Sequence, residues 1–176
     1  NNSAIEVTFS EAVFSKSDGS GALETTDFVL ILQGGAATLS SATPSSLSAT
    51  GNVYTLGIGL SGTPNGIEVL TVTLVDSAIY DAASHIASVT QNNNSTTLFD
   101  QKAPTITSVS PSSDNSSIIV IFSEAVFSKS DGSGDLDTTD FVFSIQDGKA
   151  TLASINPTSI SARDSTYTLG IALSGI

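Results

Sequence analysis

The strongest constraint on the fold of this chain is an internal repeat. Residues 9–21, FSEAVFSKSDGSG, return unchanged as residues 122–134, which lie 113 positions further along the chain. The same offset aligns residues 1–63 with residues 114–176 without a gap, and about two thirds of the aligned pairs are identical. A repeat period of 113 residues is the length of a small domain rather than of a solenoid turn, so the sequence predicts a tandem array of domains.

The repeat also predicts where the domains begin and end. We expect one domain at residues 1–101, which lacks its first strand, and a second at residues 102–176, which ends before its last strands. The second copy stops at the counterpart of Thr63 and has no partner for residues 64–101. We therefore expect the chain to be a section cut from a longer array.

Short stretches of alternating apolar and polar residues indicate half-buried β-strands. They occupy residues 5–10, 28–33, 54–61, 70–74, 96–99 and 105–109. The repeat extends the pattern to residues 118–122, 141–145 and 167–173, where the core-facing positions stay apolar. Gly34 and Gly35 predict a hairpin turn into residues 37–39. About seven short strands per unit, without an amphipathic helix, predict an all-β sandwich.

Composition excludes several classes of partner. The chain carries 17 acidic residues against 5 basic ones, for a net charge of −12. Nucleic acid and anionic membrane surfaces both require clustered Lys and Arg, so neither is an expected partner. Cysteine is absent from the sequence, which excludes disulfides and thiolate metal sites. The apolar runs are too short to predict a membrane span in this segment.

The order of several short motifs resembles a known family. These are FSEAV at residues 9–13, TTDF at 25–28, YTLGI at 54–58, E-x-LTV at 68–72, IYDAAS at 79–84 and D-x-x-APTI at 100–106. Together they resemble the bacterial immunoglobulin-like repeats of the SbsA type. Such repeats are strung together in large surface proteins, including giant adhesins of Bacteroidota, some of which serve gliding. The resemblance implies tandem immunoglobulin-like β-sandwich domains, neighbouring repeats of the same chain as partners, and an extracellular location at the cell surface.

Acidic residues around the repeated loop suggest a calcium site. Asp18, Glu24 and Asp27 in the first copy place oxygen ligands around a glycine, with a spacing similar to that of a calcium-binding loop. Asp131, Asp137 and Asp140 do so in the second copy, whereas Lys16 and Lys129 stand at the first ligand position. The alternative interpretation is a polar turn in which Asp27 and Asp140 cap the backbone at the entry to a strand.

The junction between the copies offers a second candidate for calcium. Asp100, together with Asp76 and Asp81, would supply carboxylates to an ion that stiffens the connection between neighbouring domains. The reason is geometric. A short junction already restricts the motion of one domain relative to the next, and a bridging ion would remove the motion that is left. No cofactor is required by this interpretation, and calcium is its optional ligand.

The sequence contains no recognisable motif of a catalytic site. The single histidine, His85, lies in an expected turn, and no nucleophile motif accompanies it. We therefore expect that the protein is not an enzyme. Two function classes stay open: a structural spacer in a long adhesin or surface filament, and a repeated module that binds a surface glycan, ice or another host or abiotic surface through exposed loops.

Overall fold

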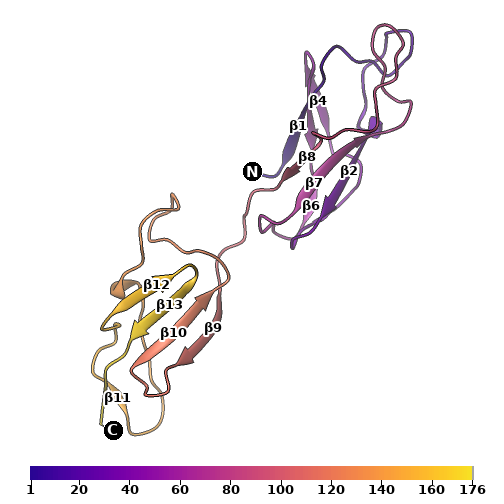
Figure 1. Ribbon diagram of the computed structural model, residues 1–176. Helices are drawn as coiled ribbons and strands as arrows, with labels where there is room; N and C mark the ends of the chain where they lie inside the picture. Colours follow the sequence, from indigo (N-terminus) through magenta and orange to yellow (C-terminus); the bar gives the residue numbers. More distant parts are fainter. Residues whose placement is uncertain (176) are drawn as a thin grey trace. The chain divides into compact units, whose positions relative to one another are not determined.

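The computed structural model describes residues 1–175, and the chain divides into two compact units, Asn1–Lys102 and Ala103–Ile176 (Figure 1). Two short 3-10 turns, η1 (Thr25–Asp27) and η2 (Thr138–Asp140), are the helical segments, and no α-helix occurs within residues 1–175. The remaining regular structure is β-strand in several small antiparallel sheets. The predicted all-β class is therefore confirmed.

The first unit contains two three-stranded antiparallel sheets, β1-β5-β4 and β2-β7-β8, and a two-stranded sheet, β3-β6. The strands are β1 (Ala4–Thr8), β2 (Phe28–Gln33), β3 (Thr38–Leu39), β4 (Leu47–Thr50), β5 (Val53–Gly57), β6 (Leu60–Ser61), β7 (Val69–Leu74) and β8 (Ser95–Thr97).

The core of the first unit draws on both three-stranded sheets. Leu56 of β5 and Leu70 of β7 are fully buried, and Phe28 and Leu30 of β2 lie in the same cluster. The alternation of apolar residues predicted these inward faces, because successive side chains of a strand point to opposite sides. Each fully buried side chain of this kind contributes about 1.5–3 kcal/mol. The arrangement is sandwich-like, with the apolar faces of two sheets in one core.

The second unit contains a four-stranded antiparallel sheet of order β12-β13-β10-β9 and a two-stranded sheet, β11-β14. The strands are β9 (Ile106–Pro111), β10 (Ser117–Phe122), β11 (Thr151–Leu152), β12 (Ile160–Arg163), β13 (Thr166–Gly170) and β14 (Leu173–Ser174). Val120, Tyr167 and Leu169 form its buried cluster.

Strand pairing recurs at the repeat offset. Val7 of β1 lies opposite Tyr54 of β5, and Val120 of β10 lies opposite Tyr167 of β13. The two units therefore use equivalent residues for the centre of this sheet. The second unit also has β9 along the outer edge of β10, where Val109 lies opposite Val120.

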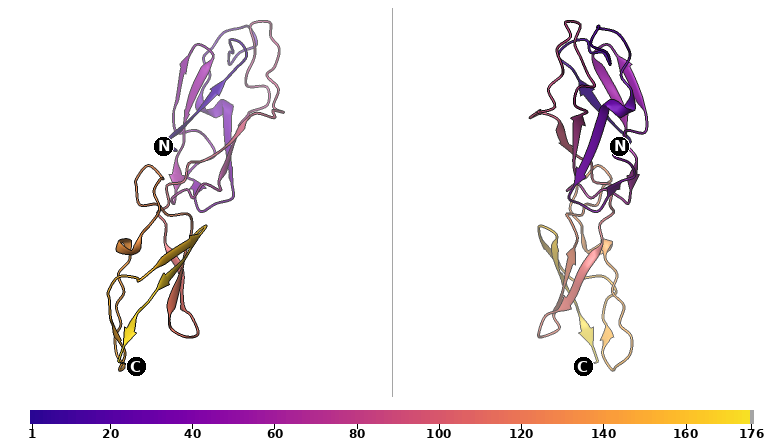
Figure 2. Two further views of the ribbon diagram at one scale, coloured as in Figure 1. Left: turned by 60° about the vertical axis from the view of Figure 1, so that its left-hand side comes forward. Right: turned by 90° about the vertical axis from the view of Figure 1, so that its right-hand side faces the viewer.

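One predicted strand is not formed. Residues 141–146 correspond to β2, but they follow an irregular path, and Figures 1 and 2 show the orange part of the ribbon after β10 as mostly irregular chain. In the first unit β2 pairs along its whole length with β7. Within residues 1–175 no strand pairs with residues 141–146. The prediction was wrong because a strand needs a hydrogen-bonding neighbour as well as an alternating sequence.

The predicted hairpin at Gly34 and Gly35 is also wrong. Both glycines do have positive φ, 76° and 66°. However, β2 pairs with β7, whereas β3 pairs with β6. The two glycines therefore carry the chain from one sheet to another. Local turn chemistry predicted the change of direction, and the pairing partner was decided by residues further along the chain.

Candidate functional site: the repeated loop and the acidic turns

The repeated loop has the same backbone geometry in both units. In the first unit the Ser15 amide donates to the Gly21 carbonyl at 3.1 Å, and the Lys16 amide donates to the Ser20 carbonyl at 3.0 Å. In the second unit the equivalent bonds, from Ser128 to Gly134 and from Lys129 to Ser133, both measure 3.1 Å. The loop conformation is therefore set by its own sequence.

Glycine is required at the end of this loop. Gly21 has a φ of 84°, and Gly134, its counterpart, has a φ of 80°. A Cβ atom at Gly21 would collide with the Ser15 hydroxyl, and one at Gly134 would collide with the Ser128 hydroxyl. Both the backbone conformation and the close approach exclude a larger residue.

A tyrosine from the core anchors each loop at its root. The Tyr54 hydroxyl donates to the Val13 carbonyl at 3.5 Å, and the Tyr167 hydroxyl donates to the Val126 carbonyl at 3.3 Å. The rings belong to aromatic clusters, Phe9, Phe28 and Tyr54 in one unit and Phe122, Phe141 and Tyr167 in the other. The core therefore fixes where the loop leaves the unit.

Asp18 and Asp131, two of the predicted calcium ligands, lie exposed at the loop tips. Asp18 accepts a hydrogen bond from the Ser20 amide at 3.0 Å and another from the Ser20 hydroxyl, and the hydroxyl bond is the main cause that lowers the pKa of Asp18. Asp131 accepts from the Ser133 amide at 3.0 Å and from its hydroxyl. Each carboxylate thus closes an Asx-type turn.

The other predicted ligands beside the loop cap the following 3-10 turn. Asp27 accepts from the Glu24 amide, and Asp140 accepts from the Asp137 amide, both at 2.8 Å. Asp137 also accepts from the Thr139 amide at 2.7 Å, and the Thr139 hydroxyl lowers the pKa of the Asp137 carboxyl. These contacts are the capping arrangement that the alternative interpretation expects at the entry to the strand.

Asp100 has a similar local role. Its Oδ1 accepts from the Lys102 amide at 2.8 Å, and its Cβ lies 3.2 Å from the position a Cβ would take at Gly66. Among residues 1–175, no three Asp, Glu or His side chains are grouped as metal ligands. The structure therefore brings the predicted carboxylates to backbone amides rather than to one another, and calcium binding stays a prediction.

A turn at residues 79–86 packs against the loop of the first unit. The Phe14 and Tyr80 backbones exchange two hydrogen bonds of 2.8 Å, and the Ser84 hydroxyl donates to the Ser17 carbonyl. In the first unit these contacts attach the loop to the turn and add to the hydrogen bonds within the loop. In the second unit Phe127, the counterpart of Phe14, is 51% exposed.

His85 lies on the outside of this turn, with its side chain 80% exposed. Its Nδ1 lies 2.8 Å from Asp81 Oδ2, and Asp81 Oδ1 accepts from the His85 amide at 2.8 Å. The hydrogen bond that the His85 ring donates to Asp81, together with the negative charge of Asp81, raises the pKa of His85, and the same contact lowers the pKa of Asp81. The pair stabilises the turn.

Glu68 is a buried carboxylate that the sequence analysis did not select. It is 0% exposed, and its Oε1 accepts from the amides of Ala36 at 2.7 Å and Ala37 at 3.0 Å, while its Oε2 accepts from the Asn65 amide at 3.0 Å. Burial alone raises its pKa, but these backbone hydrogen bonds outweigh burial and lower the pKa to about 2.

Glu68 joins two turns that are distant in the sequence. Its carboxylate lies against Gly35, where a Cβ atom would collide with it. The charge is satisfied by amides from the turn at residues 34–37 and from Asn65. The sequence signal was weak, because a single glutamate beside apolar residues resembles an exposed strand position. Glu68 therefore stabilises the packing of these two turns against each other by accepting hydrogen bonds from both.

Comparisons of this chain with protein-family models, with curated proteins and with solved structures found no match. In the part of the chain that the structure describes, no helix has the length and apolar character needed to cross a bilayer.

Proposed function

We propose that this chain is a structural spacer segment of a long, repetitive extracellular adhesin or surface filament. In this proposal its units are tandem immunoglobulin-like β-sandwich domains that recur every 113 residues. They hold an adhesive region away from the cell, and their partners are the neighbouring repeats of the same chain.

One observation carries the proposal: the central strand pairing, the aromatic pair beside it and the adjoining loop recur in both units, which is more than the repetition of an isolated site. The Phe9–Tyr54 and Phe122–Tyr167 ring pairs have centroid distances of 5.5 and 5.6 Å, and the loops beside them have the same hydrogen bonds. Repeated core geometry of this kind suits a protein whose length and stiffness matter. The net charge of −12 favours units that repel one another and stay soluble.

The second candidate is a binding module, and the loop geometry is the observation that favours it. Identical loops with the same conformation would present the same contact surface from each unit, and weak contacts add along an array. The exposed lysine and aspartate at each tip, Lys16 with Asp18 and Lys129 with Asp131, would meet a glycan or mineral surface.

The experiment that tests the spacer proposal has two readouts. Antibodies against the chain should label intact cells of the source organism, and a protease added outside the cells should remove the label. Labelling only after permeabilisation would overturn the surface location. The chain should also bind no glycan array or mineral surface. Binding that is lost in a chain carrying Asp18→Ala and Asp131→Ala would favour the binding module instead.

A further inference from the structure

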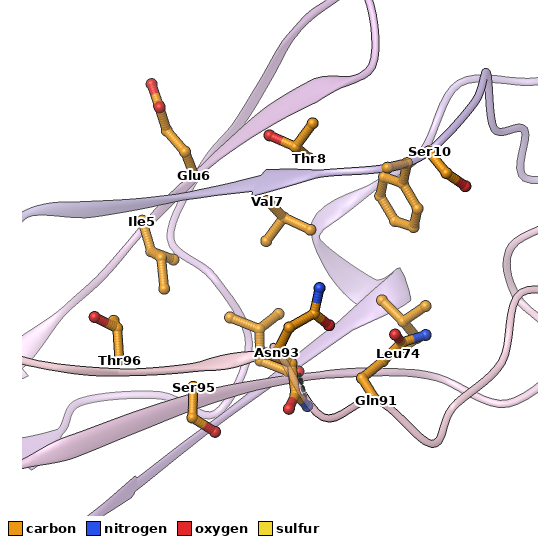
Figure 3. Close-up of a pocket in the computed structure, with 13 residues that line it drawn as sticks. Ile5, Glu6, Val7, Thr8, Ser10, Leu74, Gln91, Asn93, Ser95 and Thr96 are labelled. Atoms are coloured by element: carbon orange, nitrogen blue, oxygen red, sulfur yellow. Dashed lines mark hydrogen bonds between the residues drawn. The ribbon is translucent and has the colours of Figure 1, made fainter.

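The outer edge of β1 in the first unit opens into a groove of about 690 Å³. Ile5, Val7 and Phe9 form one wall, Val72 and Leu74 of β7 form the floor, and polar residues at and before β8 form the other wall. Figure 3 shows Ile5 and Val7 pointing from β1 toward Asn93 and Thr96, whereas Glu6 and Thr8 point away. The groove therefore separates the edges of two sheets and has an apolar base.

The second unit shows what covers the equivalent edge. There β9 pairs with β10, the counterpart of β1, and places Val109 opposite Val120 and Ile106 opposite Phe122. Opposite residues of an antiparallel pair lie on the same face of the sheet. At the repeat offset Val120 corresponds to Val7 and Phe122 to Phe9, so a strand like β9 would direct its apolar side chains into the groove.

The polar contacts of β9 have matching groups in the first unit. The Ser123 amide donates to the Thr105 carbonyl at 2.8 Å, the Ser123 hydroxyl accepts from the Thr105 amide at 3.0 Å, and the Ile121 carbonyl accepts from the Thr107 hydroxyl at 3.0 Å. Their counterparts are Ser10 and Thr8. Among residues 1–175 the Ser10 amide has no hydrogen-bond partner.

We propose that the groove beside β1 is a strand-acceptor site that binds an extended peptide segment of the β9 type. The segment runs antiparallel to β1, and its carbonyl at the position of Thr105 accepts from the Ser10 amide. Residues at the positions of Val109 and Ile106 fill the space above Val7 and Phe9. An edge strand with unpaired backbone groups is a template for such addition, and the alternate side chains give its specificity. This site is independent of the spacer function.

The first experiment adds a peptide with the sequence of residues 103–113 to the full chain and follows backbone amide signals by NMR. We expect saturable shifts at Glu6, Thr8 and Ser10 and slower hydrogen exchange of the Ser10 amide. A peptide that carries Val109→Asp should bind at least about tenfold more weakly, because it would bury an unpaired charge. Equal binding of the two peptides, or shifts at β10 alone, would overturn the proposal.

Two variants of the acceptor separate the backbone contact from the side chain. Ser10→Pro removes an amide donor that has no partner among residues 1–175, and it should weaken binding of the peptide by at least about tenfold. Ser10→Ala keeps the donor and should retain most of the affinity. If Ser10→Pro binds as tightly as the unchanged chain, the strand does not pair with β1.

A second measurement does not depend on the affinity of a free peptide. Residues 103–113 are copied directly in front of Asn1, which restores the spacing that they have before Asp114 in the second unit. We expect the melting temperature of the first unit to rise and the Ser10 amide to become protected. The same copy with Val109→Asp is the control. An unchanged melting temperature in both chains would contradict the proposal, and so would an equal rise.

Discussion

The ring of Phe9 meets the ring of Tyr54 edge-on, with centroids 5.5 Å apart and an interplanar angle of 86°. Phe28 completes the cluster, and it is 1% exposed. Phe9 directly follows β1, Phe28 is in β2 and Tyr54 is in β5, so the cluster connects the two three-stranded sheets of the first unit. Edge-to-face aromatic pairs of this kind add to the free energy of area burial.

Replacement of Phe28 by alanine should destabilise the first unit by about 3–5 kcal/mol, because it removes a buried ring and leaves a cavity. Tyr54→Phe keeps its ring and removes one hydrogen bond of 3.5 Å, so it should cost about 1 kcal/mol or less. Amide hydrogen exchange at Leu56 reports the free energy of unfolding of the first unit, and exchange at Leu169 reports that of the second. Equal losses for the two variants would show that the ring cluster is not the source of stability.

Gly35→Ala should destabilise the chain more than Gly148→Ala, although the two positions correspond in the repeat. Both residues have positive φ, 66° and 88°, so both substitutions strain the backbone. Only at Gly35 would the new Cβ meet the Glu68 carboxylate, because nothing lies within 4 Å of a Cβ at Gly148. Chemical denaturation of the two variants gives the difference. Equal effects would mean that Glu68 moves aside without cost.

Glu68→Gln should destabilise the first unit at neutral pH by about 1–3 kcal/mol, because a charged acceptor of backbone amides is lost. The folded pKa of about 2 lies below the ordinary value of 4.5. The contribution of the carboxylate is therefore fully present above pH 4.5 and is lost as the pH falls through about 2. Thermal unfolding from pH 7 to pH 2 should show the unchanged chain and the variant converging. A constant difference would contradict the assignment.

The pKa of His85 in the folded chain should lie above 6.5, because Asp81 accepts a hydrogen bond from its ring and attracts its charge. The stabilising contact is fully present below pH 6.5 and is lost as the pH rises through the raised folded pKa. NMR titration of the imidazole gives the value directly. Asp81→Asn should return it toward 6.5. No change in that variant would place the cause elsewhere.

If the loop carboxylates act only as acceptors of their local hydrogen bonds, chelation of calcium should change the melting temperature by less than about 2 °C. A site saturated at a hundred times its Kd would add about 2.7 kcal/mol and raise the melting temperature by several degrees. Calorimetry with millimolar calcium and with chelator distinguishes the two. A large rise, removed by Asp18→Asn or Asp131→Asn, would establish the loop as a calcium site.

Several features of the fold could be predicted from the sequence because they depend on neighbouring residues. The alternation at residues 28–33 and 70–74 gave β2 (Phe28–Gln33) and most of β7 (Val69–Leu74). The identical thirteen-residue loops took the same conformation in both units, and the capping roles of Asp27 and Asp140 followed from turn chemistry. Each of these depends on contacts a few positions apart.

The tertiary structure decided which strands pair and which polar groups are buried. Residues 28–33 and 141–146 have related sequences, yet only the first set forms a strand, because β7 lies beside it. Glu68 is buried because amides from residues 36 and 37, on another turn, meet its carboxylate. The role that we propose for the groove beside β1 comes from a comparison with the second unit, where β9 pairs with the equivalent edge of β10. Hydrogen-bond partners and close packing come from residues far along the chain, so a local pattern cannot determine them.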